Sequence, residues 1–453
     1  MGLSNIFDIA TRSLGVYQSA LDVTAQNISN ASNPDYSRQR VILGTETPQQ
    51  LGGFIWGTGV KLEDISRIHN ALTDQQLRDN SSKYSSNNES SVLLDQVQSV
   101  LNEPSDQGIS GLTTAFFNAW QQLSVTPNSV SLRQNVIQAA QNLSQQIQTV
   151  KQGFDTIQTS LKSGITTDVS TINSDLKKIQ SLNAQIFNLQ STGQTPNDLL
   201  DQRDKAINDL SSMVNINVNY DSQNVANISI GGVFAVDKVT AMQFKTTMQD
   251  GKILVTTQDG AASLNLTGGQ LYGDANVYNN KIPSYQSSID SFVNNLMQSV
   301  NDAHSSGYTL DNPPQTGINF FSGYSNGTLQ INDQILNDPN KIAVSSDGTA
   351  GNGDIALSIA GLSTQKQADG SSLLDKYSSI VSQIGTDAKG ASDTADSYNL
   401  VVQQLQQQQA SYSGVSVDEE MTNVIQYQKS YTASAKLITV ADQMLQTLLN
   451  MVS

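Results

Sequence analysis

Residues 415–453, at the end of the chain, read VSVDEEMTNVIQYQKSYTASAKLITVADQMLQTLLNMVS. Neither proline nor glycine interrupts this stretch, and apolar residues recur along it at alternating spacings of three and four. A seven-residue repeat of this kind predicts one long helix with a narrow apolar seam. The C-terminal seam comprises Val424, Tyr427, Tyr431, Ser434, Ile438, Ala441, Leu445, Leu448 and Val452. Because a narrow seam on one helix cannot be buried alone, the helix requires a partner.

The first residues of the chain carry a seam with the same spacing. It comprises Leu3, Phe7, Ala10, Leu14, Tyr17, Leu21, Thr24 and Ile28. An ordinary core helix is the alternative for either seam taken alone, but matching seams at both ends favour a terminal coiled coil of residues 1–36 and 413–453. We expect Leu445 to be buried against Leu14, Leu21 and neighbouring subunits.

Between the two ends the pattern is mainly helical. Segments with few helix breakers, at 70–101, 112–123 and 130–189, predict an elongated helical bundle. Alternation of apolar and polar residues predicts short strands, separated by Asp-Gly and Gly-Gly turns. These strands are expected at 40–43, 59–65, 214–220, 228–230, 242–245, 253–257 and 264–266, with a hairpin or arm at 51–59.

The predicted fold class is therefore α+β, mainly α, with paired terminal coiled-coil helices, an elongated helical bundle and a small inserted β domain. The bundle is assigned to residues 37–213, 273–306 and 362–412, with a β-hairpin arm near 40–66. The inserted β domain is assigned to 214–272 and 307–361.

Composition excludes several classes of function. The chain has 453 residues, of which 24 are basic and 40 acidic, and a net charge of −16. This charge argues against nucleic acid and against an anionic membrane surface as partners. The sequence contains no cysteine, so disulfides and thiol chemistry are absent. No stretch predicts a membrane span or a conventional signal peptide, which fits either a cytoplasmic protein or export without a cleaved signal.

Catalytic motifs are not found in the sequence. His69 and His304 are far apart, and each is expected to have a surface or packing role. The acidic stretch Asp201–Asp204 is interpreted as an exposed, ion-paired helix face. Residues 351–354 lack the ligand spacing of a calcium loop. We therefore expect no cofactor, no metal site and no enzymatic activity.

Residues 27–38 read NISNASNPDYSR, and their pattern alone predicts a helix end and a turn, because Pro34 forces the residue before it into an extended conformation. This motif and the C-terminal seam resemble the axial proteins of the bacterial flagellum, the rod, hook and hook-associated proteins. Asp35 stands where a glycine is usual in that family. The matching residues are Asn27, Asn30, Pro34, Tyr36 and Arg38.

Segments in the middle resemble the hook-associated protein 1 family, notably 116–120, 132–134, 197–210 and 305–308. This resemblance implies an extracellular adaptor at the hook–filament junction, exported by the flagellar type III apparatus without a cleaved signal peptide. The implied partners are further copies of the chain, the hook protein, a second hook-associated junction protein and an export chaperone.

Three alternatives remain open at this stage. A flagellar hook or distal rod protein would share both terminal patterns, but it usually has more β structure in the middle. A secreted coiled-coil adhesin or translocator would work as a soluble monomer. An enzyme would require an activity tied to a specific carboxylate.

Overall fold

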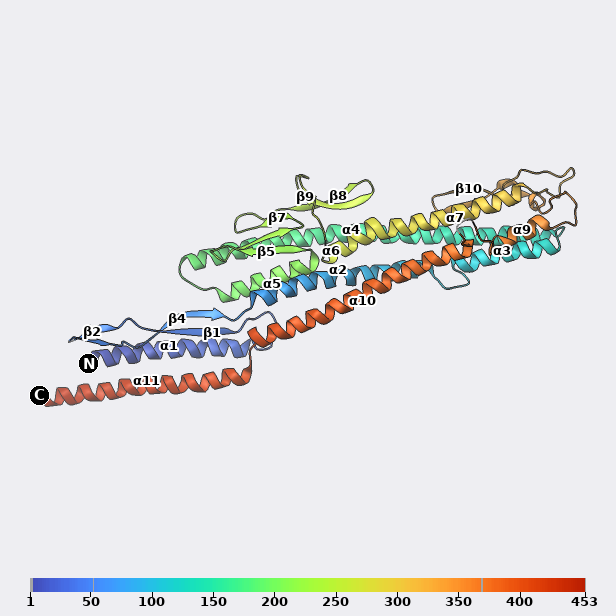
Figure 1. The fold of residues 1–453 in the computed structure, drawn as a ribbon. Helices are drawn as coiled ribbons and strands as arrows, with labels where there is room; N and C mark the ends of the chain where they lie inside the picture. Colours follow the sequence, from blue (N-terminus) through green and yellow to red (C-terminus); the bar gives the residue numbers. More distant parts are fainter. Residues whose placement is uncertain (1–2, 52, 368–369, 453) are drawn as a thin grey trace.

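A computed structural model places residues 3–51, 53–367 and 370–452. The molecule is an elongated rod of long helices that carries a few small antiparallel sheets (Figure 1). This architecture confirms the predicted α+β, mainly α fold class. Within the described ranges, no helix combines the length and the apolar character needed to cross a membrane.

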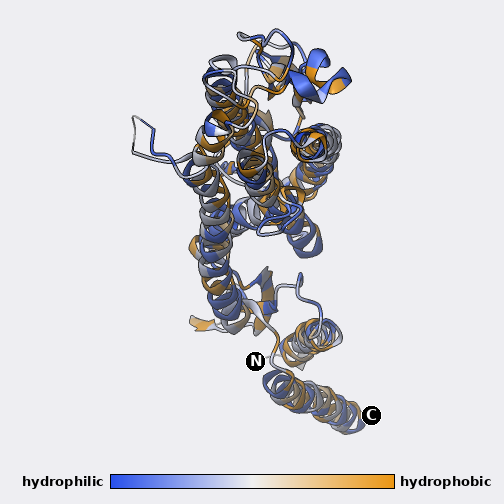
Figure 2. Cartoon of the chain, turned by 90° about the vertical axis from the view of Figure 1, so that its right-hand side faces the viewer, coloured by the Kyte–Doolittle hydropathy of each residue, from blue (hydrophilic) through white to orange (hydrophobic). Residues whose placement is uncertain are grey.

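The two ends of the chain form a pair of helices. Helix α1 (Leu3–Ser29) and helix α11 (Val417–Val452) lie side by side and antiparallel at one end of the rod, with both termini at the same tip (Figure 1). Figure 2 shows this terminal pair set apart from the other helices. The sequence patterns therefore predicted the pairing of the two ends correctly.

A β arm follows α1 and lies along it. Strands β1 (Gln39–Thr45) and β4 (Val60–Arg67) pair antiparallel, and β2 (Gln49–Leu51) pairs with β3 (Phe54–Trp56) at the tip of the arm. The arm approaches α1 closely at Gly59, where a Cβ atom would lie 3.2 Å from Cγ2 of Ile9.

Long helices form the body of the rod. They are α2 (Ala71–Leu101), α3 (Ile109–Val125), α4 (Val130–Ser191), α5 (Asn197–Met213), α7 (Ile282–Ser305) and α10 (Leu373–Ser413). Helix α4 has 62 residues and spans about 93 Å at 1.5 Å per residue. Helices α2 and α10 pack along each other, and α3 packs on α4. A helix of this length is stable because its apolar row is buried along nearly all of it.

Helix starts and shorter elements complete the body. Side chains of Asn70, Ser129 and Ser372 cap the starts of α2, α4 and α10, and Ser372 forms a capping box with Asp375. The short elements are α6 (Gln270–Asn276), a π-helical turn (Val277–Lys281), α8 (Asp333–Asn337), a 3₁₀ turn (Pro339–Lys341) and α9 (Asp354–Gly361).

Three small sheets lie on the helices of the body. They are β5 (Ile216–Tyr220), β6 (Ala226–Ile230) and β7 (Val233–Val236) in one sheet, β8 (Phe244–Gln249) with β9 (Lys252–Thr257), and β10 (Phe321–Ser325) with β11 (Thr328–Ile331). The sequence patterns missed β7. They also predicted a strand at 264–266, which is an extended link instead: the backbone of Leu264 bonds to Val255, and that of Asn265 bonds to Gly231.

The strands share their core with the helices. Buried Ile228 and Phe244 belong to the same apolar cluster as Val169 and Ile172 of α4. Strands β10 and β11 join no sheet with β5–β9 in the described part of the chain, and they lie farther along the rod, near α7 (Figure 1). Residues 214–272 and 307–361 thus pack on α4 at separate places.

Candidate functional site

The small and polar members of the two predicted seams are buried more completely than the large apolar members. Ala10 of α1 and Ala441 of α11 are almost fully buried, as is Ala20, which lies outside the predicted seam. Most of the large seam residues are half-buried in the single chain: Phe7, Leu14, Tyr17, Leu21, Ile28, Val424, Tyr427 and Ile438. Tyr431, Leu445 and Leu448 are exposed by 38, 40 and 50 %. The side chains of Leu3 and Val452 lie outside the described part of the structure.

The register of the pair corrects one expectation. Burial raises the pKa of Tyr427, and the charges of Glu420 and then Tyr17 raise it further, so Tyr17 of α1 lies near Tyr427 of α11. From Tyr427, Leu445 lies 18 residues, or about 27 Å, towards the C-terminus. In an antiparallel pair this direction leads past the N-terminal end of α1, so Leu445 does not pack on Leu14 or Leu21. The expectation failed because a heptad pattern gives the buried face of a helix but not its register.

The turn after α1 is held by a network around Asn27. The Tyr36 hydroxyl donates to Oδ1 of Asn27 at 2.8 Å, and the backbone N–H of Gln39 donates to the same oxygen at 2.9 Å. Nδ2 of Asn27 donates to the carbonyl oxygen of Gln39 at 2.9 Å. Asn27 is 1 % exposed, so each of these groups is satisfied away from water. Three bonds therefore fix the path from α1 into β1.

Arg38 ties this turn to the start of α11. Its Nε donates to Oε1 of Glu420 and its Nη1 donates to Oε2 of Glu419, each at 2.7 Å. Its backbone N–H donates to the carbonyl oxygen of Ser413 at 2.8 Å. Burial lowers the pKa of Arg38, but the hydrogen bond to Glu419 and the charge of Glu420 outweigh burial and raise it. We call this cluster of Arg38, Glu419 and Glu420 the latch.

A second ion-pair cluster joins the same turn to the body. The backbone N–H of Ser37 donates to Oδ2 of Asp201 at 3.0 Å. Nη1 of Arg67 on β4 lies 2.9 Å from Oδ1 of Asp201 and 2.6 Å from Oδ2 of Asp204. Arg67 and Asp201 have only 8 % of their side chains exposed. The expected exposed face of α5 is thus wrong for Asp201, because the arm covers it.

The remaining motif residues line the outer side of the turn. Nδ2 of Asn30 donates to the carbonyl oxygen of Gln26, and Pro34 is exposed. Asp35, at the position where a glycine is usual, forms an ion pair with Lys205 of α5 at 3.2 Å. The side chain at this position therefore adds a further link between the turn and the body.

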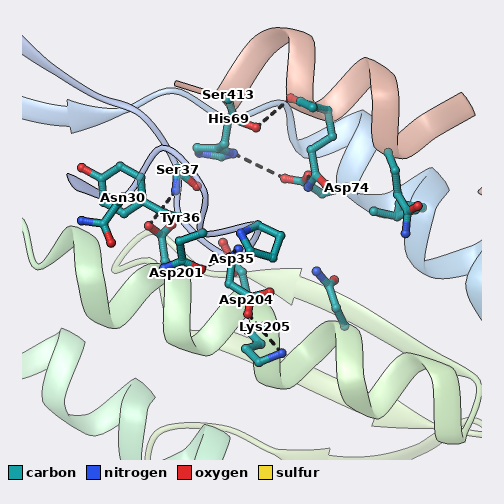
Figure 3. A pocket seen from close by; sticks show the side chains of 18 of the residues that line it. Asn30, Asp35, Tyr36, Ser37, His69, Asp74, Asp201, Asp204, Lys205 and Ser413 are labelled. Carbon is teal, nitrogen blue, oxygen red and sulfur yellow. Dashed lines mark hydrogen bonds and ion pairs between the residues drawn. The ribbon is translucent and has the colours of Figure 1, made fainter. Parts of the chain in front are cut away.

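These links surround a cavity of about 630 Å³ between the terminal pair and the body. Its walls come from residues 30–37, the start of α2, α5 and the end of α10. Figure 3 shows Tyr36 and Ser37 beside Asp201, and His69 directed at Asp74, with 3.7 Å between Nδ1 and Oδ2. In the described part of the chain, no group of three or more His, Cys, Asp or Glu side chains is arranged to hold a metal ion.

His304 has a packing role, as expected. It is fully buried, its Nδ1 contacts the carbonyl oxygen of Ile318 at 2.7 Å, and its Nε2 accepts from the backbone N–H of Ala343 at 2.9 Å. Burial lowers its pKa to about 4, so the ring is neutral near pH 7.

Sequence reasoning found Asn27, Tyr36 and Arg38 but missed their partners. Glu420 was visible only as part of an acidic first turn, and Arg67 only as a residue beside a predicted strand. The sequence did contain a usable signal. Arg38 of the motif and the adjacent acids Glu419 and Glu420 at the start of the last helix have opposite charges, so an ion pair between them could have been predicted.

A family model described as the flagellar hook-associated protein FlgK helical domain matches residues 94–321, just over half of the chain. The chain belongs to the FlgK family. A second model, the C-terminal domain of flagellar basal body rod FlgEFG proteins, matches residues 406–451. The second match covers nearly all of α11 and includes the latch carboxylates Glu419 and Glu420.

Full-length relatives support the same membership. Flagellar hook-associated protein 1 of Bacillus subtilis is 29 % identical over 98 % of this chain and 97 % of its own length. Its counterpart in Escherichia coli is 24 % identical over 99 % of this chain and all of its own length. The flagellar hook junction protein FlgK of Burkholderia pseudomallei has the same fold, with a TM-score of 0.64 at 16 % identity, and it covers 75 % of this chain.

Proposed function

We propose that this chain is a structural adaptor of the bacterial flagellum that joins the hook to the filament by helical self-assembly through its terminal helices. One observation carries the proposal. The C-terminal half of α11 presents a second apolar row that α1 leaves uncovered. Its members, exposed by 40 to 78 %, are Leu437, Val440, Met444, Leu448 and Met451.

This second row has the spacing of a further helix seam. Its members are three or four residues apart, so they share one face of the helix. Continuous exposed apolar surface of this kind marks a protein interface. Contact between this row and a different face of the next copy is heterologous, and repetition of such a contact builds a ring or a helical tube.

The length of α11 supports the same assembly. Helix α11 has 36 residues and α1 has 27, and α11 extends beyond the N-terminal end of α1 (Figure 1). Leu445, Leu448 and Leu449 lie on this extension and are exposed by 40 to 62 %. Because α1 does not reach this extension, neighbouring copies of the chain cover its exposed leucines in the assembly.

The proposed partners are further copies of the chain, the hook protein on one side and a second hook-associated junction protein on the other. The chain acts outside the cell, without catalysis and without a cofactor. It is exported through the flagellar type III apparatus without a cleaved signal peptide. An export chaperone binds the exposed rows of α11 as a helix in a groove. Deletion of residues 415–453 should abolish chaperone binding in a pull-down assay.

The direct test is deletion of the gene followed by electron microscopy of the cells. The proposal predicts hooks without filaments and flagellin released into the medium, with both defects repaired by the full chain and not by a chain lacking residues 415–453. Cells without hooks would indicate a hook or rod protein instead. Cells with normal filaments would indicate a protein that acts outside the flagellar axis, such as an adhesin.

A further inference from the structure

Arg78 on α2 is a buried cation without a partner. Only 8 % of the residue is exposed, and none of the hydrogen bonds or ion pairs in the described chain includes its side chain. The other deeply buried arginines are all bonded: Arg67 to Asp201 and Asp204, Arg133 to backbone carbonyls, and Arg203 to the carbonyl oxygen of Asn224. A largely buried guanidinium without a counter-charge is stabilised when an anion binds beside it.

Arg78 lines a cavity of about 350 Å³ and also the cavity of about 630 Å³ between the terminal pair and the body. The walls of the smaller cavity come from α2, the end of α5, β5 and the turn at residues 267–268. The charged residues in the walls are Arg78, Lys83 and Asp79, so their sum is positive although the whole chain carries a charge of −16. The net charge of the cavity walls is therefore opposite in sign to the net charge of the chain.

A second buried polar group in the same wall has no partner. Ser82 is 7 % exposed, and its hydroxyl forms no hydrogen bond in the described structure. In the opposite wall, by contrast, both polar groups of the Asn215 side chain are hydrogen-bonded. Its Oδ1 accepts from the N–H of Thr267 at 3.1 Å, and its Nδ2 donates to the carbonyl oxygen of Asn265 at 3.3 Å. The available donors on this side are thus the guanidinium and the serine hydroxyl, one helical turn apart on α2.

We propose that this cavity binds a small oxyanion, a carboxylate or a phosphate-type group, held by the guanidinium of Arg78 with the Ser82 hydroxyl as a supporting donor. The planar fork of an arginine matches two oxygens of such a group. The oxyanion neutralises the buried charge and ties α2 to β5 and the 267–268 turn. The source is either a free anion or an acidic side chain of a second copy of the chain.

Thermal melting of the full chain in increasing sodium phosphate, at constant ionic strength kept with sodium chloride, tests the site. Binding to the folded state alone raises the melting temperature with phosphate concentration. Arg78→Met should reduce phosphate affinity at least tenfold, and Ser82→Ala should reduce it less. Lys162→Gln, which removes one positive charge from an exposed position on α4, should keep the wild-type response.

The melting temperature of the Arg78→Met variant without phosphate gives a second test. Because the variant removes an unpaired buried charge, it should melt at or above the wild-type temperature in chloride alone. A variant that melts well below the wild type in chloride would show that Arg78 has a structural partner, and this would overturn the proposal.

Sedimentation of the chain, first without phosphate and then with it, distinguishes a free anion from an acidic side chain of a second copy. Self-association that requires Arg78 and is reversed by phosphate identifies a carboxylate of a second copy. Phosphate binding by a chain that stays monomeric identifies a free anion. Absence of both effects overturns the proposal. The adaptor role would be unaffected, because no residue of α11 lines this cavity.

Discussion

Asp274 on α6 is 4 % exposed, and the charged groups that act on it are two other carboxyls, Glu89 of α2 and Asp168 of α4. Burial, followed by the charges of Glu89 and Asp168 and a hydrogen bond shared with Asp168, raises the pKa of Asp274 to about 8. Between the ordinary carboxyl pKa and pH 8, Asp274 is therefore protonated in the folded chain and ionised in the unfolded chain, so folding binds one proton. The stability that this carboxyl contributes is fully present below its unfolded pKa and is lost as pH rises through about 8.

Asp274→Asn should remove this loss. An asparagine keeps the hydrogen bond to Asp168 and never ionises, so the variant should be more stable than the wild type at pH 8 to 9. We expect a gain of at least about 1.4 kcal/mol, the free energy of one pKa unit, because burial and the neighbouring carboxyls raise the pKa of Asp274 by several units. At pH 4 the gain should vanish. Urea unfolding at the two pH values measures both, and Asp95→Asn, at an exposed position on α2, is the control.

Asp201 shows which part of a site cannot be predicted from a local charge pattern. An Asp-rich segment of a helix normally faces water and pairs with neighbours three or four residues away. Here the partner is Arg67, 134 positions earlier in the sequence, and the arm that carries Arg67 buries the pair. The sequence predicted that Asp201 is ion-paired. It could not predict that the partner is Arg67 or that the pair is buried, because both depend on the tertiary contact between α5 and the arm.

At the scale of elements, the latch sets where α11 begins. Glu420 has 2 % of its side chain exposed, whereas Glu419 has 63 %. Arg38→Ala leaves the Glu420 carboxylate buried without a counter-charge, and we expect it to destabilise the start of α11 by about 3–5 kcal/mol. Hydrogen exchange of the first turns of α11 measures this loss.

Glu419→Gln is the matched control for the latch. It removes the exposed ion pair and should cost less than about 1 kcal/mol. Equal effects of Arg38→Ala and Glu419→Gln on hydrogen exchange would show that the latch acts as a surface pair.

Leu445→Asp tests the exposed end of α11. Leu445 is 40 % exposed in the single chain, so the substitution should leave the fold of the monomer intact. In the assembly each subunit should lose roughly 1.5–3 kcal/mol of burial and also bear a desolvated carboxylate. We expect loss of filaments and motility with unchanged circular dichroism melting. Gln446→Asp, next to Leu445 and also exposed, should be tolerated. Normal filaments in the Leu445→Asp strain would contradict the assembly role of this exposed end of α11.

Helices were easier to predict than strands because their patterns are longer. The buried row of α4 repeats over 62 residues, and its predicted end at 189 lies two residues before the observed one at Ser191. Strand β7 has four residues and no clear alternation, so only the turn at Gly231 and Gly232, both with positive φ, marks its start.

At the scale of the whole molecule, the core stops short of the terminal pair. The main apolar cluster extends from Leu93 to Ala388 and includes no described side chain of α1 or α11. The terminal pair instead meets the body through the turn after α1, where Ser37 bonds to Asp201 and Asp35 pairs with Lys205 beside the cavity. Assembly surface and folded core are therefore separate parts of the chain.

This separation predicts that residues 39–412 fold without the terminal helices. The truncated chain keeps the main cluster, the long helices of the body and the Arg67–Asp201 ion pair, so its main thermal transition should coincide with that of the full chain. It should also fail to form rings or tubes, because it lacks both seams and the second row of α11. Calorimetry measures the transition, and electron microscopy measures the assembly. A main transition that falls well below that of the full chain would show that α1 and α11 support the body, and assembly of the truncated chain would place the self-association surface on the body instead.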